Sequence, residues 1–304
     1  KLEFDNKRRN SNLGYIIKNR DFLSVVYSNL SKKNNFKIYN NIQLCDLQFN
    51  KEKIISNTSK YNIVSDVIIA ADGRQSYIKN FFKTPSYNKD YKKTALVLTF
   101  THTINHHNTA FEFFYPNGPL AILPMKKNNG EFCSSIVWTS DDKYIRKLKN
   151  IDNSTLIKIL NQETHNSVGN IKKIISKQIF PLSAHINSKF FERRAVYVGD
   201  SAHSFHPIAG QGWNLGMSDV ENLYKLFKKY KSLGIDPGDS FFCKEYHNES
   251  FYRAYRLYQI TDKLDSIFQI ETPIFNFSRS LGLQFINKNK RIKNLLSDFA
   301  MGVN

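Results

Sequence analysis

Cysteine is scarce in this sequence, and the three cysteines follow no pattern. Cys45, Cys133 and Cys243 are odd in number and lie far apart, and no Cys-x-x-Cys pair occurs. Such a set argues against a disulfide framework and against a metal site built from thiolates. The cysteine content therefore fits a reducing cytoplasm best.

Long apolar runs are absent as well. No stretch approaches the roughly 18 consecutive apolar residues that a spanning helix needs, and the chain does not open with a basic and then apolar leader. We expect a cytoplasmic protein, and the alternative is a peripheral protein on the inner face of the membrane.

Acidic residues are outnumbered, with 26 Asp and Glu against 44 Lys and Arg, for a net charge of +18. A basic balance can indicate nucleic acid, an anionic membrane or an acidic ligand as the partner. The lysines are scattered and mixed with asparagine, as an AT-rich coding bias would also produce, and no basic-aromatic binding module occurs. We therefore expect no nucleic acid partner, while a contribution from a membrane surface stays open.

Two glycine motifs are missing. No G-x-S-x-G turn occurs, which argues against a serine hydrolase of the α/β type. The G-x-G-x-x-G turn, which places a dinucleotide diphosphate on a helix N-terminus, does not occur either. Because the chain begins at Lys1 within a polar run, we expect a fragment that lacks its beginning.

Local patterns predict an α/β fold with an α+β insert. Residues 13–19 read as a strand and residues 20–30 as a helix. The nearly all-apolar stretch 67–71 is typical of a strand buried on both faces, and 193–199 predicts a second buried strand of the parallel type.

The middle of the chain has a different pattern, in which apolar and polar residues alternate. Alternation over 94–138 predicts antiparallel strands, with turns at 116–119 and 126–130. We further expect a helix over 151–164 and a returning strand at 178–182. These elements indicate a separate sheet.

The last third is predicted to be helical. Residues 234–239 end a first helix, and a long helical tail follows with a break at Pro273. The predicted apolar faces are Val220, Leu223, Phe227 and Tyr230 in the first helix, and Leu257, Ile260, Leu264 and Ile267 in the tail.

The stretch "AVYVGDSAHSFHPIAGQGWNLGMSDVENL" at 195–223 has more small and polar residues than a connection needs. Gly199 and Asp200 stand where a buried strand ends, which is where open α/β sheets bind ligands. A carboxylate there can accept hydrogen bonds from two hydroxyls, such as those of a ribose or ribityl chain. The helix that begins near Gly212 directs its free N–H groups to the same place. The pattern predicts a partner that is anionic or becomes anionic.

This run resembles the second FAD-binding motif of the single-component (group A) FAD-dependent aromatic monooxygenases, and "HPIAGQGWNLG" most resembles the branch that makes ubiquinone. The stretch "VIIAADGRQS" at 67–76 resembles the Asp-Gly motif of the same family. Further likeness lies in "LGYIIKNR", "NGPLAILPM", "FPLSAH" and "ITDKLDSIF", so the resemblance covers nearly the whole chain.

The resemblance implies roles for individual residues. Asp200 would hold the ribityl hydroxyls of FAD, and Gly199 would permit approach to the diphosphate side. Asp72, Gly73 and Arg74 would serve FAD and NAD(P)H together, and Arg20 would contact the cofactor from the first helix. The residues beside the isoalloxazine edge would be Pro207, Gly210, Gln211 and Gly212, and Asn214 would be a further cofactor-binding residue. No residue is identified as catalytic.

The resemblance also implies a fold and its division into domains. The fold is the Rossmann-like FAD/NAD(P)-binding fold of the flavoprotein hydroxylases, with an antiparallel-sheet substrate domain. We expect residues 1–76 to form part of the FAD-binding domain together with strands of the substrate sheet. Residues 77–184 would form the substrate domain, 185–233 the rest of the FAD-binding domain, and 234–304 a helical C-terminal region.

The activity implied by the resemblance is hydroxylation of the aromatic ring of a polyprenylated phenol precursor of ubiquinone. NAD(P)H would be the reductant, and O2 would react through a hydroperoxide at flavin C4a. Contact with a membrane or with a ubiquinone-biosynthesis complex would accompany it. Two alternatives stay open: a non-catalytic flavin-fold partner of such a complex, and a soluble aromatic-acid hydroxylase.

Several histidines have competing interpretations. Asp200, His203 and His206 have the spacing of metal ligands, but they lie in a turn and no further ligand cluster occurs, so we expect no metal. His102, His106 and His107 are expected at a solvated strand edge.

Aromatic and tail residues also have two interpretations. Trp138, Phe113 and Phe114 are expected in the core rather than around a cofactor. The tail is expected to pack on its own domain, and an interfacial helix is the alternative. The residues that favour the alternative are Lys288, Lys290, Arg291, Lys293, Ile286, Ile292, Leu295 and Leu296.

Overall fold

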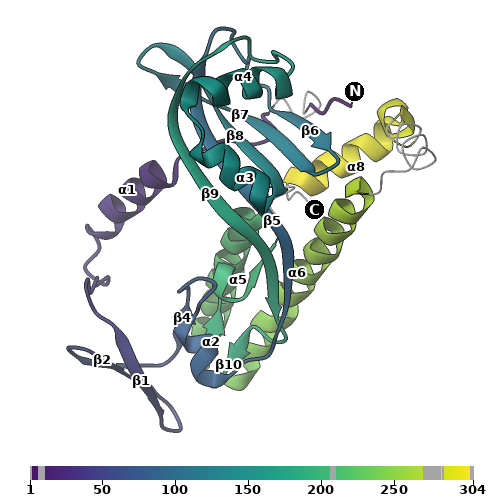
Figure 1. Ribbon diagram of the computed structural model, residues 1–304. Helices are drawn as coiled ribbons and strands as arrows, with labels where there is room; N and C mark the ends of the chain where they lie inside the picture. The colour runs from purple at the N-terminus through teal and green to yellow at the C-terminus, as the bar shows by residue number, and fades with distance from the viewer. Residues whose placement is uncertain (1, 6–10, 206–209, 270–281, 283, 302–304) are drawn as a thin grey trace. The chain divides into compact units, whose positions relative to one another are not determined.

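The protein is a mixed α/β fold with an antiparallel sheet and a helical C-terminal region, as the sequence predicts (Figure 1). It is represented by a computed structural model. The structure describes residues 2–5, 11–205, 210–269, 282 and 284–301.

The helices are α1 (Asn19–Leu30), α2 (Tyr77–Phe82), α3 (Asp142–Asn150), α4 (Asn153–Glu163), α5 (Gly212–Ser232), α6 (Ser240–Gln269) and α8 (Lys290–Met301), with a short 3-10 helix η2 (Gly199–Ser201). The strands are β1 (Leu44–Phe49), β2 (Ile54–Thr58), β3 (Asn62–Ser65), β4 (Ile68–Ala70), β5 (Ser86–His102), β6 (Phe111–Tyr115), β7 (Gly118–Asn128), β8 (Glu131–Asp141), β9 (Ile171–Asn187), β10 (Phe191–Glu192), β11 (Ala195–Tyr197) and β12 (His203–Ser204).

The chain folds into two compact units, each made of separate stretches of sequence. One unit combines Ile17–Lys89 with Ser183–Thr261. The other combines Lys1–Ile16, Asp90–Leu182 and Asp262–Asn304. Both motif runs that carry the resemblance lie in the first of these units. The domain boundaries expected at residues 76, 184 and 233 stay a prediction.

The six-stranded sheet has the order β12-β9-β5-β8-β7-β6. The pairs β5–β8, β7–β8 and β6–β7 are antiparallel, which confirms the prediction from the alternation of residues 94–138. The predicted returning strand at 178–182 lies within the longer β9. The first predicted turn is shorter than expected, because β7 already begins at Gly118.

One face of this sheet carries a core that two helices complete. The core side chains are Leu96, Leu98, Phe100, Leu120, Ile122, Ile136 and Trp138 from the strands, and Ile145, Leu148, Leu156 and Leu160 from α3 and α4. The sequence predicts α4 and misses α3. The carboxylate of Asp152 accepts a 2.9 Å hydrogen bond from the Thr155 N–H, which fixes where α4 begins. Each fully buried leucine contributes about 2 kcal/mol of hydrophobic stabilisation.

Two predictions for this sheet are wrong in detail. Phe114 is 47% exposed rather than part of the core, because side chains alternate between the two faces of β6 and the neighbouring Phe113 is the one that packs on the core. His102 is 1% exposed rather than solvated, because β5 lies between β9 and β8. Its ring nitrogens bond to the Ile104 carbonyl and the Ser134 hydroxyl, both at 2.9 Å.

A smaller sheet of the order β10-β11-β4 contains the two strands predicted to be parallel. β11 pairs with β4 in parallel, with Val196 opposite Ile69, and all three residues of β11 are buried. β4 is not buried on both faces as predicted, since Ile69 is 46% exposed. Within the described residues, the face of β4 that carries Ile69 is therefore only partly covered.

The predicted strand at residues 13–19 is not formed. Residues 13–18 belong to no strand, and α1 begins at Asn19. A strand needs a neighbour to pair its N–H and C=O groups, and no described strand pairs with this stretch. The helix predicted at 20–30 is confirmed. The β-rich run that follows it forms a separate antiparallel sheet of β1, β2 and β3.

The predicted apolar face of α5 is rotated from the observed one. Leu223 and Tyr230 are buried as predicted, but Val220 is 48% exposed. The buried face consists of Leu215, Asp219, Asn222, Leu223, Leu226 and Tyr230. Phe227 and Tyr230 contact Phe242 of α6, with ring centroids 4.8 and 5.3 Å apart.

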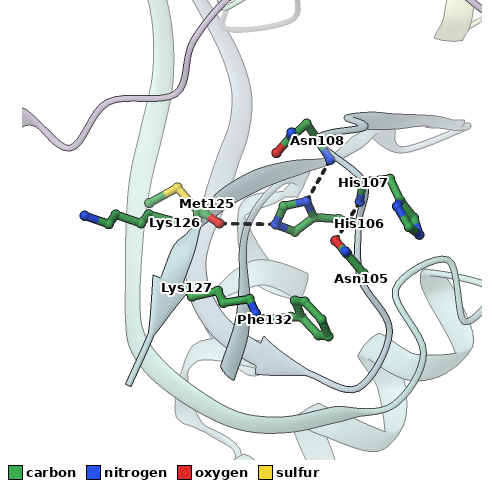
Figure 2. Close-up of a pocket in the computed structure, with 8 residues that line it drawn as sticks. All are labelled: Asn105, His106, His107, Asn108, Met125, Lys126, Lys127 and Phe132. Carbon is green, nitrogen blue, oxygen red and sulfur yellow. Dashed lines mark hydrogen bonds between the residues drawn. The ribbon is translucent and has the colours of Figure 1, made fainter. Parts of the chain in front are cut away.

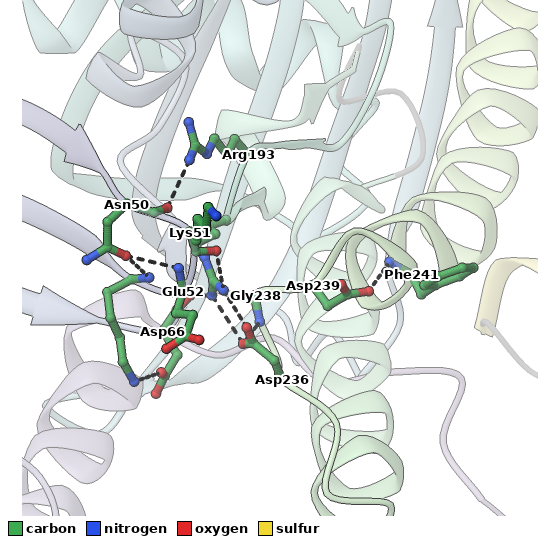
Figure 3. A network of polar contacts seen from close by, with 11 residues as sticks. Asn50, Lys51, Glu52, Asp66, Arg193, Asp236, Gly238, Asp239 and Phe241 are labelled. Carbon is green, nitrogen blue, oxygen red and sulfur yellow. Dashed lines mark hydrogen bonds and ion pairs between the residues drawn. The ribbon is translucent and has the colours of Figure 1, made fainter.

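A polar network around Arg194 joins three segments of the same unit. Figure 3 shows the network with Asp66, Arg193 and Asp236 labelled. The buried guanidinium donates hydrogen bonds to the carbonyl oxygens of Asp66 at 2.8 Å and Lys51 at 3.2 Å. It also forms an ion pair with the carboxylate of Asp236. Next to it, Arg193 donates to the Asn50 carbonyl at 2.9 Å. The network fixes the turn at residues 50–53 against the segment that precedes α6.

Among the described helices, none combines the length and the apolar character that crossing a membrane requires.

Candidate cofactor-binding site

The two motif runs meet at the carboxyl ends of the parallel strands. Asp72, Gly73 and Arg74 follow β4, and Gly199 and Asp200 follow β11. Because the strands are parallel and paired, both runs emerge at the same edge of the sheet.

Hydrogen bonds fix these strand ends against each other. The Val198 N–H donates to the Ala70 carbonyl at 3.0 Å, and the Ser201 hydroxyl donates to the same oxygen. The tertiary structure therefore brings together segments that are more than a hundred residues apart in sequence.

Gly199 turns the chain from β11 into η2 in a conformation that favours glycine. Its φ is +56°, in the left-handed region. A Cβ at Gly216 of α5 would lie 3.4 Å from the Cα of Gly199, so the turn and the helix pack backbone against backbone. Because neither glycine has a side chain, the turn can pack closely on the start of α5.

Asp200 presents a carboxylate to solvent beside this turn. Its side chain is exposed and makes no hydrogen bond or ion pair within the described residues. The carboxylate is therefore available to accept hydrogen bonds from hydroxyl groups of a ligand.

The first N–H groups of α5 have no hydrogen-bond partner inside the helix. Gln211 is the N-cap and lacks a capping hydrogen bond from its side chain, and Gly212, Trp213 and Asn214 are exposed. The Leu215 N–H makes the helical bond to the Gln211 carbonyl at 2.9 Å, so the preceding N–H groups are free of intrahelical partners. No acidic residue stands in the first turn, so the positive end of the helix is not neutralised there. Gly210, with φ +59°, precedes this end, and Pro207 lies outside the described residues.

Asp72 and Arg74 are engaged in contacts within the protein. One carboxylate oxygen of Asp72 accepts a 2.8 Å hydrogen bond from the Tyr77 N–H at the start of α2. The Arg74 guanidinium donates to the carbonyl of Ser183 at 2.9 Å and to the hydroxyls of Ser183 and Ser204. These contacts hold β4 against β9 and β12, and direct cofactor contacts of Asp72 and Arg74 stay a prediction.

The remaining predicted residues are placed as follows. Gly73 has φ +78°, in the turn between Asp72 and Arg74. Arg20 is exposed in the first turn of α1, a helix without buried residues. Cofactor contacts of either residue stay a prediction.

Asp219 is a buried carboxylate to which the sequence interpretation gave no role. It lies on the buried face of α5, and one oxygen accepts hydrogen bonds from the Gly199 N–H at 3.0 Å and from His203 Nε2 at 2.7 Å. The spacing of residues in the sequence could have indicated that Asp219 is buried. Asp219 is four residues after Leu215 and four before Leu223, so it follows the helical spacing of the apolar face.

His185 is a second buried group near this site. Burial, and then the positive charges of Lys79 and Arg74, lower its pKa from 6.5 to about 4. Its Nε2 is buried and has no hydrogen-bond partner within the described residues. His185 is therefore neutral at physiological pH.

The structure does not bring Asp200 and His203 together as ligands of one metal ion. His203 bonds to Asp219 rather than to Asp200, and His206 lies outside the described residues. Within the described chain, no group of three or more His, Cys, Asp or Glu side chains could hold a metal ion.

His106 and His107 line a separate pocket of about 420 Å³ in the other unit (Figure 2). The Nε2 of His106 donates to the Met125 carbonyl at 3.2 Å, and its Nδ1 accepts from the Asn108 N–H at 3.0 Å. Both ring nitrogens are satisfied, so His106 fixes the loop. His107 is exposed, as expected for a solvated strand end.

The fold and the site together define a flavoprotein domain. The model of the FAD binding domain family matches residues 35–238, which is more than half of the chain. The chain belongs to this family.

Two curated relatives carry a more specific name. The chain is 27% identical over 287 residues to the ubiquinone hydroxylase UbiM of Neisseria meningitidis, covering 94% of this chain and 61% of the relative. It is 28% identical over 293 residues to the ubiquinone hydroxylase UbiL of Rhodospirillum rubrum, covering 95% of this chain and 67% of the relative. The chain thus spans about three fifths to two thirds of the length of these relatives.

A solved structure shares the fold. The p-nitrophenol 4-monooxygenase PnpA from Pseudomonas putida aligns with a TM-score of 0.76 at 14% identity, covering 93% of this chain and 71% of that one.

Proposed function

We propose that this chain acts as an FAD-dependent monooxygenase that hydroxylates the aromatic ring of a polyprenylated phenol precursor of ubiquinone, with NAD(P)H as reductant and O2 as oxidant. The observation that carries the proposal is the meeting of the ends of β4 and β11 next to the backbone contact of Gly199 with Gly216 of α5. Membership of the FAD binding domain family and the names of the two relatives support it.

The residues present fit FAD on two structural grounds. The exposed carboxylate of Asp200 can accept hydrogen bonds from the ribityl hydroxyls. The N–H groups at Gly212 to Asn214 lie at the positive end of a 21-residue helix, where they stabilise negative charge. This sequence contains no G-x-G-x-x-G turn that would hold the FAD diphosphate on a helix N-terminus.

The bound FAD would supply the redox chemistry that activates O2. The residues of this chain then have three tasks. Asp200 binds and orients the ribityl chain, and Gly199 leaves space for the cofactor beside the backbone. The N-terminus of α5 would hold the cofactor's ring and stabilise negative charge on it.

Asp200→Ala tests the assignment through FAD content rather than turnover. In the full-length protein, we expect the substitution to weaken FAD binding, so that the purified protein loses its FAD, measured as visible flavin absorbance per polypeptide. Asp46→Ala on β1 is the matched control, because it removes an exposed carboxylate of the same unit and should leave the FAD content unchanged. An Asp200→Ala protein with stoichiometric FAD would overturn the assignment. An unsubstituted protein that binds no FAD would favour the non-catalytic partner.

The polyprenylated substrate separates the proposal from a soluble aromatic-acid hydroxylase. We expect the specificity constant to rise with the length of the prenyl tail on the phenol. Equal activity on a phenol without a tail would favour the aromatic-acid hydroxylase.

We also propose that the protein is cytoplasmic and that α8 contacts the inner face of the membrane. α8 presents Leu295 at 68% and Leu296 at 41% exposure, and Lys290 and Arg291 are exposed on the same helix. Exposed apolar and basic residues on one helix are typical of interfacial binding. We expect the protein to sediment with vesicles of phosphatidylglycerol and not with vesicles of phosphatidylcholine. Unchanged sedimentation of a Leu295→Ser, Leu296→Ser variant would contradict the role of α8.

A further inference from the structure

Asp219 is an acidic side chain in a buried position, and burial disfavours a charged group. It is 1% exposed and lies among apolar residues on the inner face of α5. Taking a carboxylate out of water is unfavourable unless hydrogen bonds replace those of the solvent. An acidic residue at this position therefore needs partners within the protein.

The described structure gives the Asp219 side chain two hydrogen-bond donors, and both bond to the same carboxylate oxygen. Oδ2 accepts from the Gly199 N–H at 3.0 Å and from His203 Nε2 at 2.7 Å. Because a carboxylate accepts and does not donate, the Nε2 of His203 carries the hydrogen.

His203 is itself held in place. Its ring stacks parallel to that of Phe205, with centroids 5.2 Å apart, and packs at 5.4 Å against Phe190. Its backbone belongs to β12 and pairs with Ile186 of β9. The ring therefore offers Asp219 a fixed donor.

The two bonds join the turn after β11 to α5. Gly199 directly precedes Asp200, and its backbone packs on Gly216, three residues before Asp219. Displacement of Gly199 would displace Asp200 relative to the start of α5. Those two features are the groups assigned to the cofactor above.

We propose that Asp219 is a positioning residue for FAD, which through Gly199 and His203 fixes the Gly199–Asp200 turn relative to the N-terminus of α5. This inference rests on the proposed function, since it assumes that Asp200 binds FAD. Asp219 acts through Asp200 and does not itself contact the cofactor.

A double-mutant cycle on FAD binding by the full-length protein tests the proposal. Asp219→Asn keeps the size of the side chain and removes its charge, and we expect the FAD dissociation constant to rise about 10-fold. In an Asp200→Ala background, the same substitution should change the dissociation constant by less than about 2-fold, because the group that Asp219 positions is gone.

Asn222→Ala is the matched control. Asn222 is buried one turn further along α5 and donates a 2.9 Å hydrogen bond to Ser250, away from the turn. Its loss should destabilise α5 without weakening FAD binding. If Asp219→Asn does not fold, His203→Gln replaces it in the cycle, with the same expected loss of effect in the Asp200→Ala background.

The rate of hydrogen exchange of the Gly199 amide in D2O, measured without FAD, reports directly on its hydrogen bond to Asp219. It should rise in Asp219→Asn and stay unchanged in Asn222→Ala. Additive effects of Asp219→Asn and Asp200→Ala, or unchanged Gly199 exchange, would overturn the positioning role alone. An unchanged dissociation constant in Asp200→Ala itself would overturn the proposed function, and the positioning role with it.

Discussion

The hydroxyl of Tyr246 donates a 2.7 Å hydrogen bond to the carbonyl oxygen of Tyr197, and both side chains are fully buried. The bond fixes α6 against the end of β11, two residues before Gly199. Burial raises the pKa of the Tyr246 hydroxyl well above its ordinary value, so the group stays a donor across the physiological range.

Tyr246→Phe should lower the free energy of unfolding by about 1–2 kcal/mol, because it leaves a buried carbonyl without this donor. Urea denaturation measures the change. Tyr252→Phe on the same helix is the control, since Tyr252 is 68% exposed and its substitution should change stability by less than about 0.5 kcal/mol. Equal effects of the two substitutions would contradict the importance of the bond.

Arg194→Met should destabilise the protein more than Arg193→Met. Arg194 is 6% exposed, and the substitution leaves the carbonyls of Asp66 and Lys51 without this donor and removes the ion pair with Asp236, at a cost of about 2–3 kcal/mol. Arg193 is exposed and donates to one carbonyl. Thermal unfolding of both variants makes the comparison, and a larger loss for Arg193→Met would count against the network.

His185 should make the protein less stable in acid. Its folded pKa of about 4 is below its unfolded value of 6.5, so the unfolded chain binds the proton more readily between these values. The stabilisation is present above pH 6.5 and is lost as the pH falls towards 4, by up to about 3 kcal/mol. Urea unfolding at pH 7 and pH 5 should therefore differ less in His185→Gln than in the unsubstituted protein. His102 and His247, whose pKa values burial also lowers, are present in both proteins.

The three free thiols should differ in reactivity. Cys45 is exposed, whereas Cys133 and Cys243 are buried, and burial raises the pKa of Cys243 to about 12. Only the thiolate reacts with alkylating reagents, so iodoacetamide should label Cys45 alone in the folded protein. Mass spectrometry of the labelled peptides locates the site. Labelling of Cys243 without unfolding would show that α6 opens.

Gly199→Ala should test the left-handed turn. An alanine at φ +56° costs about 1–2 kcal/mol in backbone strain. Gly14→Ala is the control, because no atom lies within 4 Å of a Cβ there and its φ is not in the left-handed region. Equal stability of the two variants, measured by urea unfolding, would contradict the strain.

The sequence predicted those parts of the fold that depend on local patterns. Residues 94–138 alternate with a period of two, and β5, β7 and β8 follow from that alternation. The prediction failed where exposure depends on distant neighbours. Val220 and Phe114 are apolar but exposed, because burial is decided by which elements pack on a residue.

The sequence by itself determined the two motif runs, since their glycines, prolines and acidic residues mark ligand-binding turns after apolar strands. Only the tertiary structure decided what those residues contact. Arg74 bonds to Ser183 and Ser204, which are 109 and 130 residues away, and Asp219 reaches back 20 residues to Gly199. Such contacts require the packing of β4, β11 and α5, and no local pattern specifies which donor a buried carboxylate will meet.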